Sequence, residues 1–210
     1  MEEARVRRLK LPESTMAIVL LLTLGVLVAS YFWGKPRYKH GMYAEFVGPA
    51  TCTAECHEKQ GASWAKTRMA NSFDALRPGV YAKAKAMVGF DPEEDYTEAE
   101  ICLPCHTTGY GMVGGFVSFD KTPHMAGVTC EACHGAGGMY VETVMDAADP
   151  TFSTEQAREA GLVYPPTARV CRKCHNEDSP FIDIDYKFDY AERVARGTHE
   201  HYQLKYDHEN

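Results

Sequence analysis

The sequence has little of three things: strand-forming segments, internal repeats, and positive charge beyond its first forty residues. Strand signals are confined to Gly115–Phe119, which predicts at most one hairpin and excludes a protein built mainly of β-sheet. Residues 1–40 carry seven Lys/Arg and three Asp/Glu, whereas the remaining residues carry 15 Lys/Arg and 26 Asp/Glu. This acidic excess excludes nucleic acid as a partner and favours redox proteins that present a basic docking face.

No cysteine stands alone. The eight cysteines form four pairs, and a histidine directly follows the second member of each pair. A c-type haem requires this arrangement, because two thiols bond to its vinyl groups and the adjacent imidazole binds the iron. The expected thioether cysteines are Cys52, Cys56, Cys102, Cys105, Cys130, Cys133, Cys171 and Cys174, and the expected proximal histidines are His57, His106, His134 and His175. The pattern predicts four covalently bound haem c groups.

Three of these motifs have the spacing C-x-x-C-H, and the first, Cys52 to His57, carries one extra residue. Zinc sites also use paired cysteines, but tetrahedral zinc binding gives no reason for a histidine after every pair. A disulfide framework would not repeat such close spacing four times. We therefore interpret the chain as a tetrahaem cytochrome c.

One uncharged run extends from Ser14 to Gly34 and matches the roughly 20 residues that cross a bilayer. Tyr31, Phe32 and Trp33 near its end are typical of the aromatic belt at a membrane interface. The alternative is a cleaved signal peptide, with small residues at 28–30 as the cleavage site. We expect an uncleaved single-pass anchor in the cytoplasmic membrane, with the haem domain on the periplasmic side where haem c is attached.

The expected organisation is a cytoplasmic N-terminus at 1–13, a transmembrane helix at 14–34, a linker at 35–50 and a tetrahaem domain at 51–210. Four porphyrins leave this last domain few side chains for an apolar core of its own. The acidic clusters at Asp91–Glu100 and Asp183–Asp189 are candidate docking patches, although a solvated surface explains them equally well.

The fold class is predicted as mainly α, with short helices joined by long haem-wrapping loops. Helices are expected at Ser63–Leu76, Tyr81–Val88 and Tyr190 to about His201. Thr97 with Glu100 has the spacing of a capping box and is expected to start a turn. Ser153 with Gln156 has the same spacing, for a helix that closes at Gly161.

Several longer motifs keep their order over residues 50–203. They are Ser63-Trp64-x-x-Thr67, Asp91-Pro92-x-x-Asp95-Tyr96-Thr97, Gly127-Val128-x-Cys130-Glu131-x-Cys133-His134-Gly135-x-Gly137, Lys187-Phe188-Asp189 and His199-Glu200-His201-Tyr202. With these motifs the chain closely resembles the tetrahaem cytochrome c-554 family, the electron acceptors of hydroxylamine oxidoreductase in ammonia oxidisers. The membrane anchor is not part of that family's pattern.

The resemblance implies a compact α-rich fold with haems stacked in close pairs. It implies two axial histidines on three irons, and no protein sixth ligand on the iron of the second motif. Transferred to this sequence, the second histidine of the third-motif haem is His199.

Two positions depart from the family pattern. The family has a distal histidine twelve residues after the first-motif histidine, where this chain has Met69, and another ten residues after the third-motif histidine, where it has Val144 followed by Met145. Since His/Met ligation raises the reduction potential of haem iron, we hypothesise that Met69 ligates the fourth-motif haem and Met145 the first-motif haem. The alternatives for both methionines are core packing and an iron site left open.

The remaining histidines are weaker candidates. His124 precedes the third motif by six residues and is a possible ligand of the second-motif iron. His201 is expected to point away from His199 on a helix.

The leading functional hypothesis is electron transfer between redox partners without substrate chemistry. One alternative is an enzyme that acts on nitric oxide or a small nitrogen compound at an open second-motif haem, although the sequence offers no convincing acid/base pair there. Another is a haem-wire subunit of a larger complex or filament. No catalytic side chain is assigned.

Overall fold

The computed structural model describes residues 23, 44–146, 152–177, 179–180, 188–196 and 198–206. The chain separates into two units, Met1–Lys39 and His40–Asn210, and all described residues except Thr23 belong to the second. The transmembrane segment expected at 14–34 therefore lies almost wholly outside the described residues. Within the described ranges, no helix combines the length and the apolar character needed to span a bilayer.

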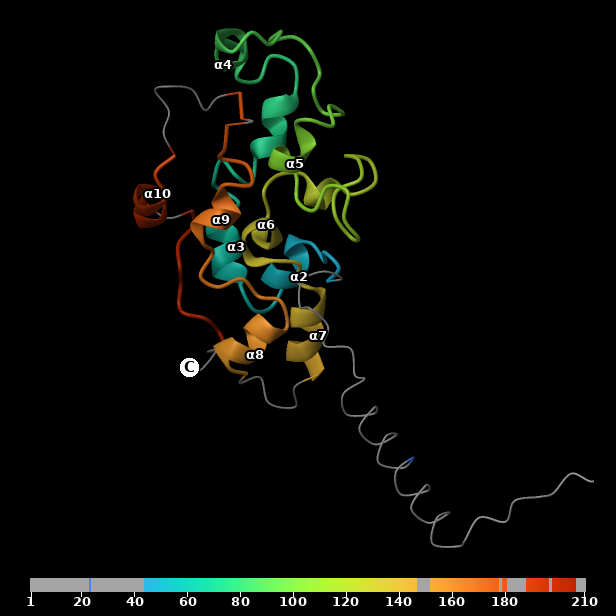
Figure 1. Ribbon diagram of the computed structural model, residues 1–210, viewed down its shortest axis with the longest axis vertical. Helices are drawn as coiled ribbons and strands as arrows, with labels where there is room; N and C mark the ends of the chain where they lie inside the picture. Colours follow the sequence, from blue (N-terminus) through green and yellow to red (C-terminus); the bar gives the residue numbers. More distant parts are fainter. Residues whose placement is uncertain are drawn as a thin grey trace, which may run out of the picture. The chain divides into compact units, whose positions relative to one another are not determined.

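The second unit consists of short helices joined by long loops (Figure 1). The α-helices are α2 (Pro49–Thr53), α3 (Glu58–Trp64), α4 (Ala82–Met87), α5 (Leu103–His106), α6 (Cys130–His134), α7 (Gly138–Asp146), α8 (Thr154–Glu159), α9 (Ala168–Cys171) and α10 (Tyr190–Arg196). Two 3-10 helices, η1 (Ser72–Leu76) and η2 (Pro123–Met125), complete the set. The expectation of a mainly α fold is confirmed.

Each cysteine–histidine motif lies on or beside one short helix. The second and third motifs lie on α5 and α6, whose last residues are His106 and His134. The first motif spans α2 and the start of α3, and His57 occupies the N-cap of α3. In the fourth motif, α9 ends at Cys171 and a turn carries the rest. A helical turn brings two thiols and an imidazole to one side of the backbone.

Two of the helix predictions agree closely with the structure. The segment expected at Tyr81–Val88 is α4, and the capping box at Ser153 begins α8. The Ser153 hydroxyl accepts the N–H of Gln156, whose side-chain oxygen accepts the N–H of Ser153. Thr97 does start a turn, but its hydroxyl donates to Asp95 rather than capping a helix.

The helix predicted at Ser63–Leu76 is wrong as a single element. Helix α3 ends at Trp64, turns follow, and η1 begins only at Ser72. Polar side chains between them bond to the backbone locally: Asn71 Nδ2 donates to the Thr67 carbonyl at 3.0 Å, and the Thr67 hydroxyl accepts the N–H of Ala70. Such bonds compete with the helical ladder, so these residues form a turn.

The strand predicted at Gly115–Phe119 is also wrong, since no strand occurs among the described residues and the bridge there joins Thr107 to Ala126. The N–H of Phe116 donates to the Thr108 carbonyl, whereas that of Val117 donates to the Thr122 hydroxyl. Because successive N–H groups find unrelated partners, no ladder forms.

The apolar core lies beside the second motif. Its buried residues are Phe73, Leu76, Leu103, Phe116 and Met125, and Cys102 packs against them. The core is therefore local to η1, α5 and η2.

Candidate haem sites

The first and third motifs are in direct contact. The thiol of Cys52 on α2 lies close to that of Cys130 on α6, and this proximity together with burial raises the pKa of Cys52. A second link comes from Glu131, whose carboxylate accepts the backbone N–H groups of Val47 and Gly48 just before α2. The two motifs therefore share one site although almost eighty residues separate them.

The other motifs continue this contact sequence. Helix α6 packs against α9. Burial raises the pKa of Cys133 to about 11, and the neighbouring thiol of Cys171 contributes to this rise. The fourth motif reaches the second where the thiol of Cys174 lies close to that of Cys105, and this proximity together with burial raises the pKa of Cys174. Contacts therefore link the motifs in the order first, third, fourth, second.

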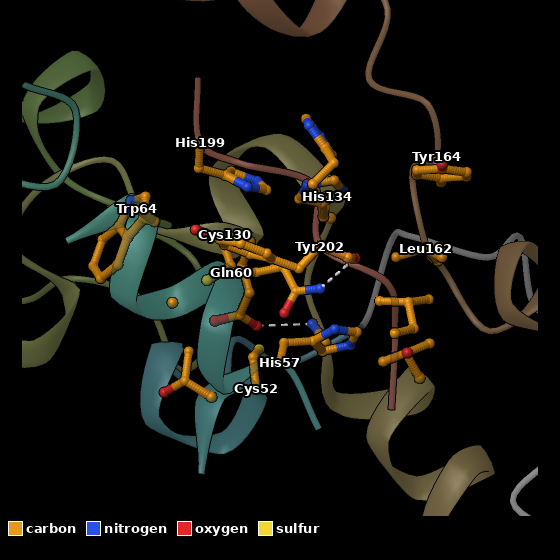
Figure 2. Close-up of a pocket in the computed structure, with 18 of the residues that line it drawn as sticks. Cys52, His57, Gln60, Trp64, Cys130, His134, Leu162, Tyr164, His199 and Tyr202 are labelled. Atoms are coloured by element: carbon orange, nitrogen blue, oxygen red, sulfur yellow. Dashed lines mark hydrogen bonds between the residues drawn. The ribbon is translucent and has the colours of Figure 1, made fainter. Parts of the chain in front are cut away.

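A cavity of about 580 Å³ lies between the first and third motifs (Figure 2). Its size is that of a cofactor pocket. Motif residues Cys52, His57, Cys130 and His134 line one part of it. Trp64, Tyr140, Leu162, Tyr164, His199 and Tyr202 are among the other lining residues.

Two imidazoles face each other across this cavity. The ring centres of His134 and His199 are 6.4 Å apart, with an angle of 52° between their planes. His134 Nδ1 lies 3.2 Å from the Val163 carbonyl oxygen and His199 Nδ1 lies 3.0 Å from that of Glu200. Both rings therefore keep Nε2 available for a metal.

The imidazoles of the second and fourth motifs are held by different contacts. His106 Nδ1 lies 2.6 Å from the Ser72 carbonyl oxygen, so its Nε2 is likewise available. The ring of His175 stacks on Phe188 with 4.5 Å between ring centres and 10° between planes. Burial lowers the pKa of His134 and of His175, which favours the neutral imidazole that binds metal.

These features test whether the residues fit haem c. None of the eight cysteines forms a disulfide, so each thiol can take part in a thioether bond. Three ring nitrogens bond to backbone carbonyl oxygens, which is the usual second bond of a metal-binding histidine. The thiols, the available Nε2 atoms and the largely apolar cavity therefore suit a covalently attached iron porphyrin.

Comparisons with known proteins agree with this geometry. The family described as "Cytochrome c554 and c-prime" matches residues 51–135. Cytochrome c-554 of Nitrosomonas europaea is 28% identical over 214 residues, which is 89% of this chain and 88% of that protein. The structure of reduced cytochrome c554 from the same organism superposes with a TM-score of 0.67 and 29% identity, over 78% of this chain and 88% of that chain.

The chain resembles cytochrome c554 in both sequence and fold. Proteins of the cytochrome c554 family are tetrahaem c-type cytochromes, and this chain has four cysteine–histidine motifs for four covalently bound haem c groups. The cofactor prediction is thereby confirmed.

The candidate distal residues lie in different places. Met69 is half-buried in the turn after α3, and its carbonyl accepts the N–H groups of Ser72 and Val128. Met145 lies in the last turn of α7, and its side chain is outside the described residues. The ring of His124, on η2, packs against Gly48. The ligand roles given to these three residues stay predictions.

His201 is not where the sequence placed it. Helix α10 ends at Arg196, so His201 follows it in irregular backbone, and its ring centre is 4.6 Å from that of His199. The next residue in the sequence after Arg196 is Gly197, and glycine commonly ends helices. His201 therefore lines the same cavity as His199 instead of pointing away from it.

The haem motifs alone predict no role for Glu131 or for the contacts of residues 200–202. Gln60 Nε2 donates to the Tyr202 carbonyl at 2.9 Å (Figure 2), and the N–H of Glu200 donates to the Ser63 hydroxyl at 2.8 Å. These bonds fasten residues 200–202 to α3. The sequence does carry a signal for Glu131. It is a charged residue between two haem cysteines, and Gly135 and Gly137 follow the motif.

Proposed function

We propose that the chain is a tetrahaem electron-transfer protein that passes single electrons along its four haem motifs. The observation that carries this proposal is the unbroken order of motif contacts, from first to third, fourth and second. When bound, the haems supply irons that take up and release single electrons. The chain holds each attachment point on or beside a short helix, and α2 packs against α6 and α6 against α9, which limits reorganisation.

His134 and His199 are proposed as the two axial ligands of the third-motif iron. Metal–imidazole nitrogen bonds are about 2 Å long, so two imidazoles on opposite faces of one metal have ring centres roughly 6 Å apart. The 6.4 Å between these rings supports this assignment. The other proximal ligands are His57, His106 and His175.

The sixth positions of the other irons are proposed from the sequence. Met69 would serve the fourth-motif haem and Met145 the first, with His124 as a further candidate at the second. A thioether ligand raises the potential of the iron that it binds. This cytochrome would then work at a higher potential than relatives with histidine at these positions.

The proposal includes the setting of the domain. Residues 14–34 anchor it to the cytoplasmic membrane and the haem domain lies on the periplasmic side. A basic face on a redox partner would dock on the acidic segment Asp91–Glu100, where the side chains of Asp91, Glu93, Glu94, Asp95, Glu98 and Glu100 are exposed. Assembly into a larger complex remains compatible with this arrangement.

Partial reduction of the purified holoprotein tests the proposal. Stopped-flow spectroscopy would follow the redistribution of less than one electron per molecule among the haems. We expect a first-order rate that does not change with protein concentration, because the electron moves within one molecule. A rate proportional to protein concentration, or rapid turnover of nitric oxide or hydroxylamine without a protein partner, would contradict it.

A further inference from the structure

One buried carboxylate lies between the first and third motifs. Glu131 is only 3% exposed and accepts three backbone N–H groups. Oε1 takes those of Val47 and Gly137 at 2.9 and 2.8 Å, and Oε2 takes that of Gly48 at 2.8 Å. Both oxygens act as acceptors, as in an ionised carboxylate. Glu131 also lines the cavity that contains His57 and His134.

No cation neutralises this carboxylate within the described part of the chain. The ion pair found there joins Arg77 to Asp74, and the partners of Glu131 are neutral N–H groups. The neighbouring Cys130 thiol and burial raise the pKa of Cys52, and the charge of Glu131 adds to this rise. Glu131 also directly follows Cys130 in the chain, so it lies beside the first and third attachment points. The site thus holds a fixed negative charge in a poorly solvated place.

A buried charge of opposite sign lies beside the second motif. Lys85 on α4 is 4% exposed, and its Nζ donates to the Arg77 carbonyl at 2.6 Å. Nζ also lies 5.3 Å from the ring centre of Tyr96, which packs against the core cluster together with Cys102. Burial raises the pKa of Cys102, and the Lys85 ammonium offsets part of this rise. Hydrogen bonds from Thr97 lower the pKa of Asp95, and Lys85 contributes to this shift. Asp95 is fully exposed, so water screens its interaction with Lys85.

We propose that Glu131 and Lys85 together set a gradient of reduction potential along the contact sequence. A fixed negative charge stabilises ferric over ferrous haem, so Glu131 lowers the potentials of the first- and third-motif haems. The ammonium of Lys85 does the opposite and raises the potential of the second-motif haem. This inference rests on the proposed electron-transfer function and adds a direction to it.

The two charges add to the effects of the sixth ligands and favour one direction of electron flow. They favour movement of an electron received at the first or third motif, by way of the fourth, to the second. The iron that gives it up becomes ferric and the iron that receives it becomes ferrous, with no transfer of atoms. A one-electron reductant protein would therefore dock near the first and third motifs, and the electron would leave near the second.

Charge-removing variants of the holoprotein test the gradient. Glu131→Gln and Lys85→Gln would be compared with wild type by potentiometric titration monitored by EPR, so that each haem is followed by its own signal. We expect E131Q to make reduction about tenfold more favourable at two haems, a rise of about 59 mV for one electron. K85Q should make reduction less favourable, by a similar factor, at a different haem.

Matched controls separate charge from fold. Glu142→Gln on α7 and Lys83→Gln on α4 remove the same charges from exposed side chains nearby and should leave all potentials unchanged. Glu131→Asp and Lys85→Arg keep the charge and should stay near wild type. If E131Q does not assemble with four haems, the K85Q variant alone provides the test. An unchanged potential of the second-motif haem in K85Q would then overturn the proposal.

The failure of the gradient can be distinguished from failure of the proposed function. Unchanged potentials in E131Q and K85Q, with electron redistribution still independent of protein concentration, would overturn the gradient alone. Loss of that concentration independence in the wild-type protein would overturn both. Shifts at the same haems in both variants would also contradict the inference, because the two charges act on different motifs.

Discussion

At the scale of single residues, the imidazoles of the haem sites are oriented by backbone carbonyl oxygens. This holds for His106, His134 and His199, whose Nδ1 atoms lie 2.6, 3.2 and 3.0 Å from carbonyl oxygens. A carbonyl fixes the ring and leaves Nε2 to the iron. The carbonyl adds no formal charge, so sixth ligands, burial and charges such as Glu131 are the features that can make the potentials of these haems differ.

The pairing of His134 with His199 gives the first residue-scale prediction. Replacing His199 with alanine removes the imidazole that faces His134, so the third-motif haem should change from low-spin to high-spin. EPR and the Soret spectrum of the oxidised protein measure this change. We expect one haem in four to convert, with haem content unchanged.

His201→Ala is the control for this variant, because His201 lies 4.6 Å from His199 between ring centres and lines the same cavity. It should keep the spectrum of wild type. A high-spin signal in H201A but not in H199A would transfer the ligand role to His201.

At the scale of elements, two short helices of the first motif lie in very close contact. Gly61 on α3 is buried against the Thr53 side chain on α2, and a Cβ at position 61 would clash with Thr53 Cγ2. Gly61 therefore allows the approach that places Cys52 and His57 together.

Replacing Gly61 with alanine should destabilise the holoprotein. In an exposed helix, by contrast, a change from glycine to alanine stabilises the helix by roughly 0.5–1 kcal/mol. Separating α2 from α3 should cost about 1–3 kcal/mol, as in other overpacked sites. Thermal unfolding measures the change. Ala62→Gly, at the exposed neighbouring position, is the control and should cost about 1 kcal/mol by propensity alone. A stabilised G61A protein would rule out a close contact.

The capping box of α8 gives a second prediction at this scale. Ser153→Ala removes the acceptor for the N–H of Gln156, which lies 3.1 Å away, and should cost about 1 kcal/mol. Urea unfolding measures the loss. Thr97→Ala is the matched control, since Thr97 has the same sequence spacing without a helix to cap, and its effect should be smaller. Equal losses would show that the cap does not stabilise α8.

Across the whole molecule, the sequence predicts the haem attachment sites better than it predicts which distant residues contact those sites. Each motif is readable because the covalent chemistry fixes its local spacing. The contact of Glu131 with Val47 and Gly48 spans more than eighty residues, and no local period reveals it. Helices were predictable where capping and propensity agreed, as at Ser153, and failed where Thr67 and Asn71 bond to nearby backbone.

The distribution of apolar side chains shows how the molecule depends on its haems. Among the described residues nine hydrophobic residues are buried, and three of them are alanines. Five of the larger ones form the cluster beside the second motif. The first and third motifs instead surround a cavity of about 580 Å³. Cofactor must therefore supply most of the packing around those two motifs, as in other systems where binding drives folding.

This difference predicts unequal consequences of losing single haem attachments. The double variant C130A/C133A should lose more stability than C102A/C105A, because among the described residues the apolar cluster lies beside the second motif. We expect a difference of about 2 kcal/mol or more in unfolding free energy, which for a domain of this size is roughly 4–8 °C in Tm. Thermal unfolding followed by far-UV circular dichroism, with haem content measured in parallel, provides the comparison. Equal losses in the two variants would mean that the cluster beside the second motif does not replace cofactor packing, and that every haem contributes to one indivisible core.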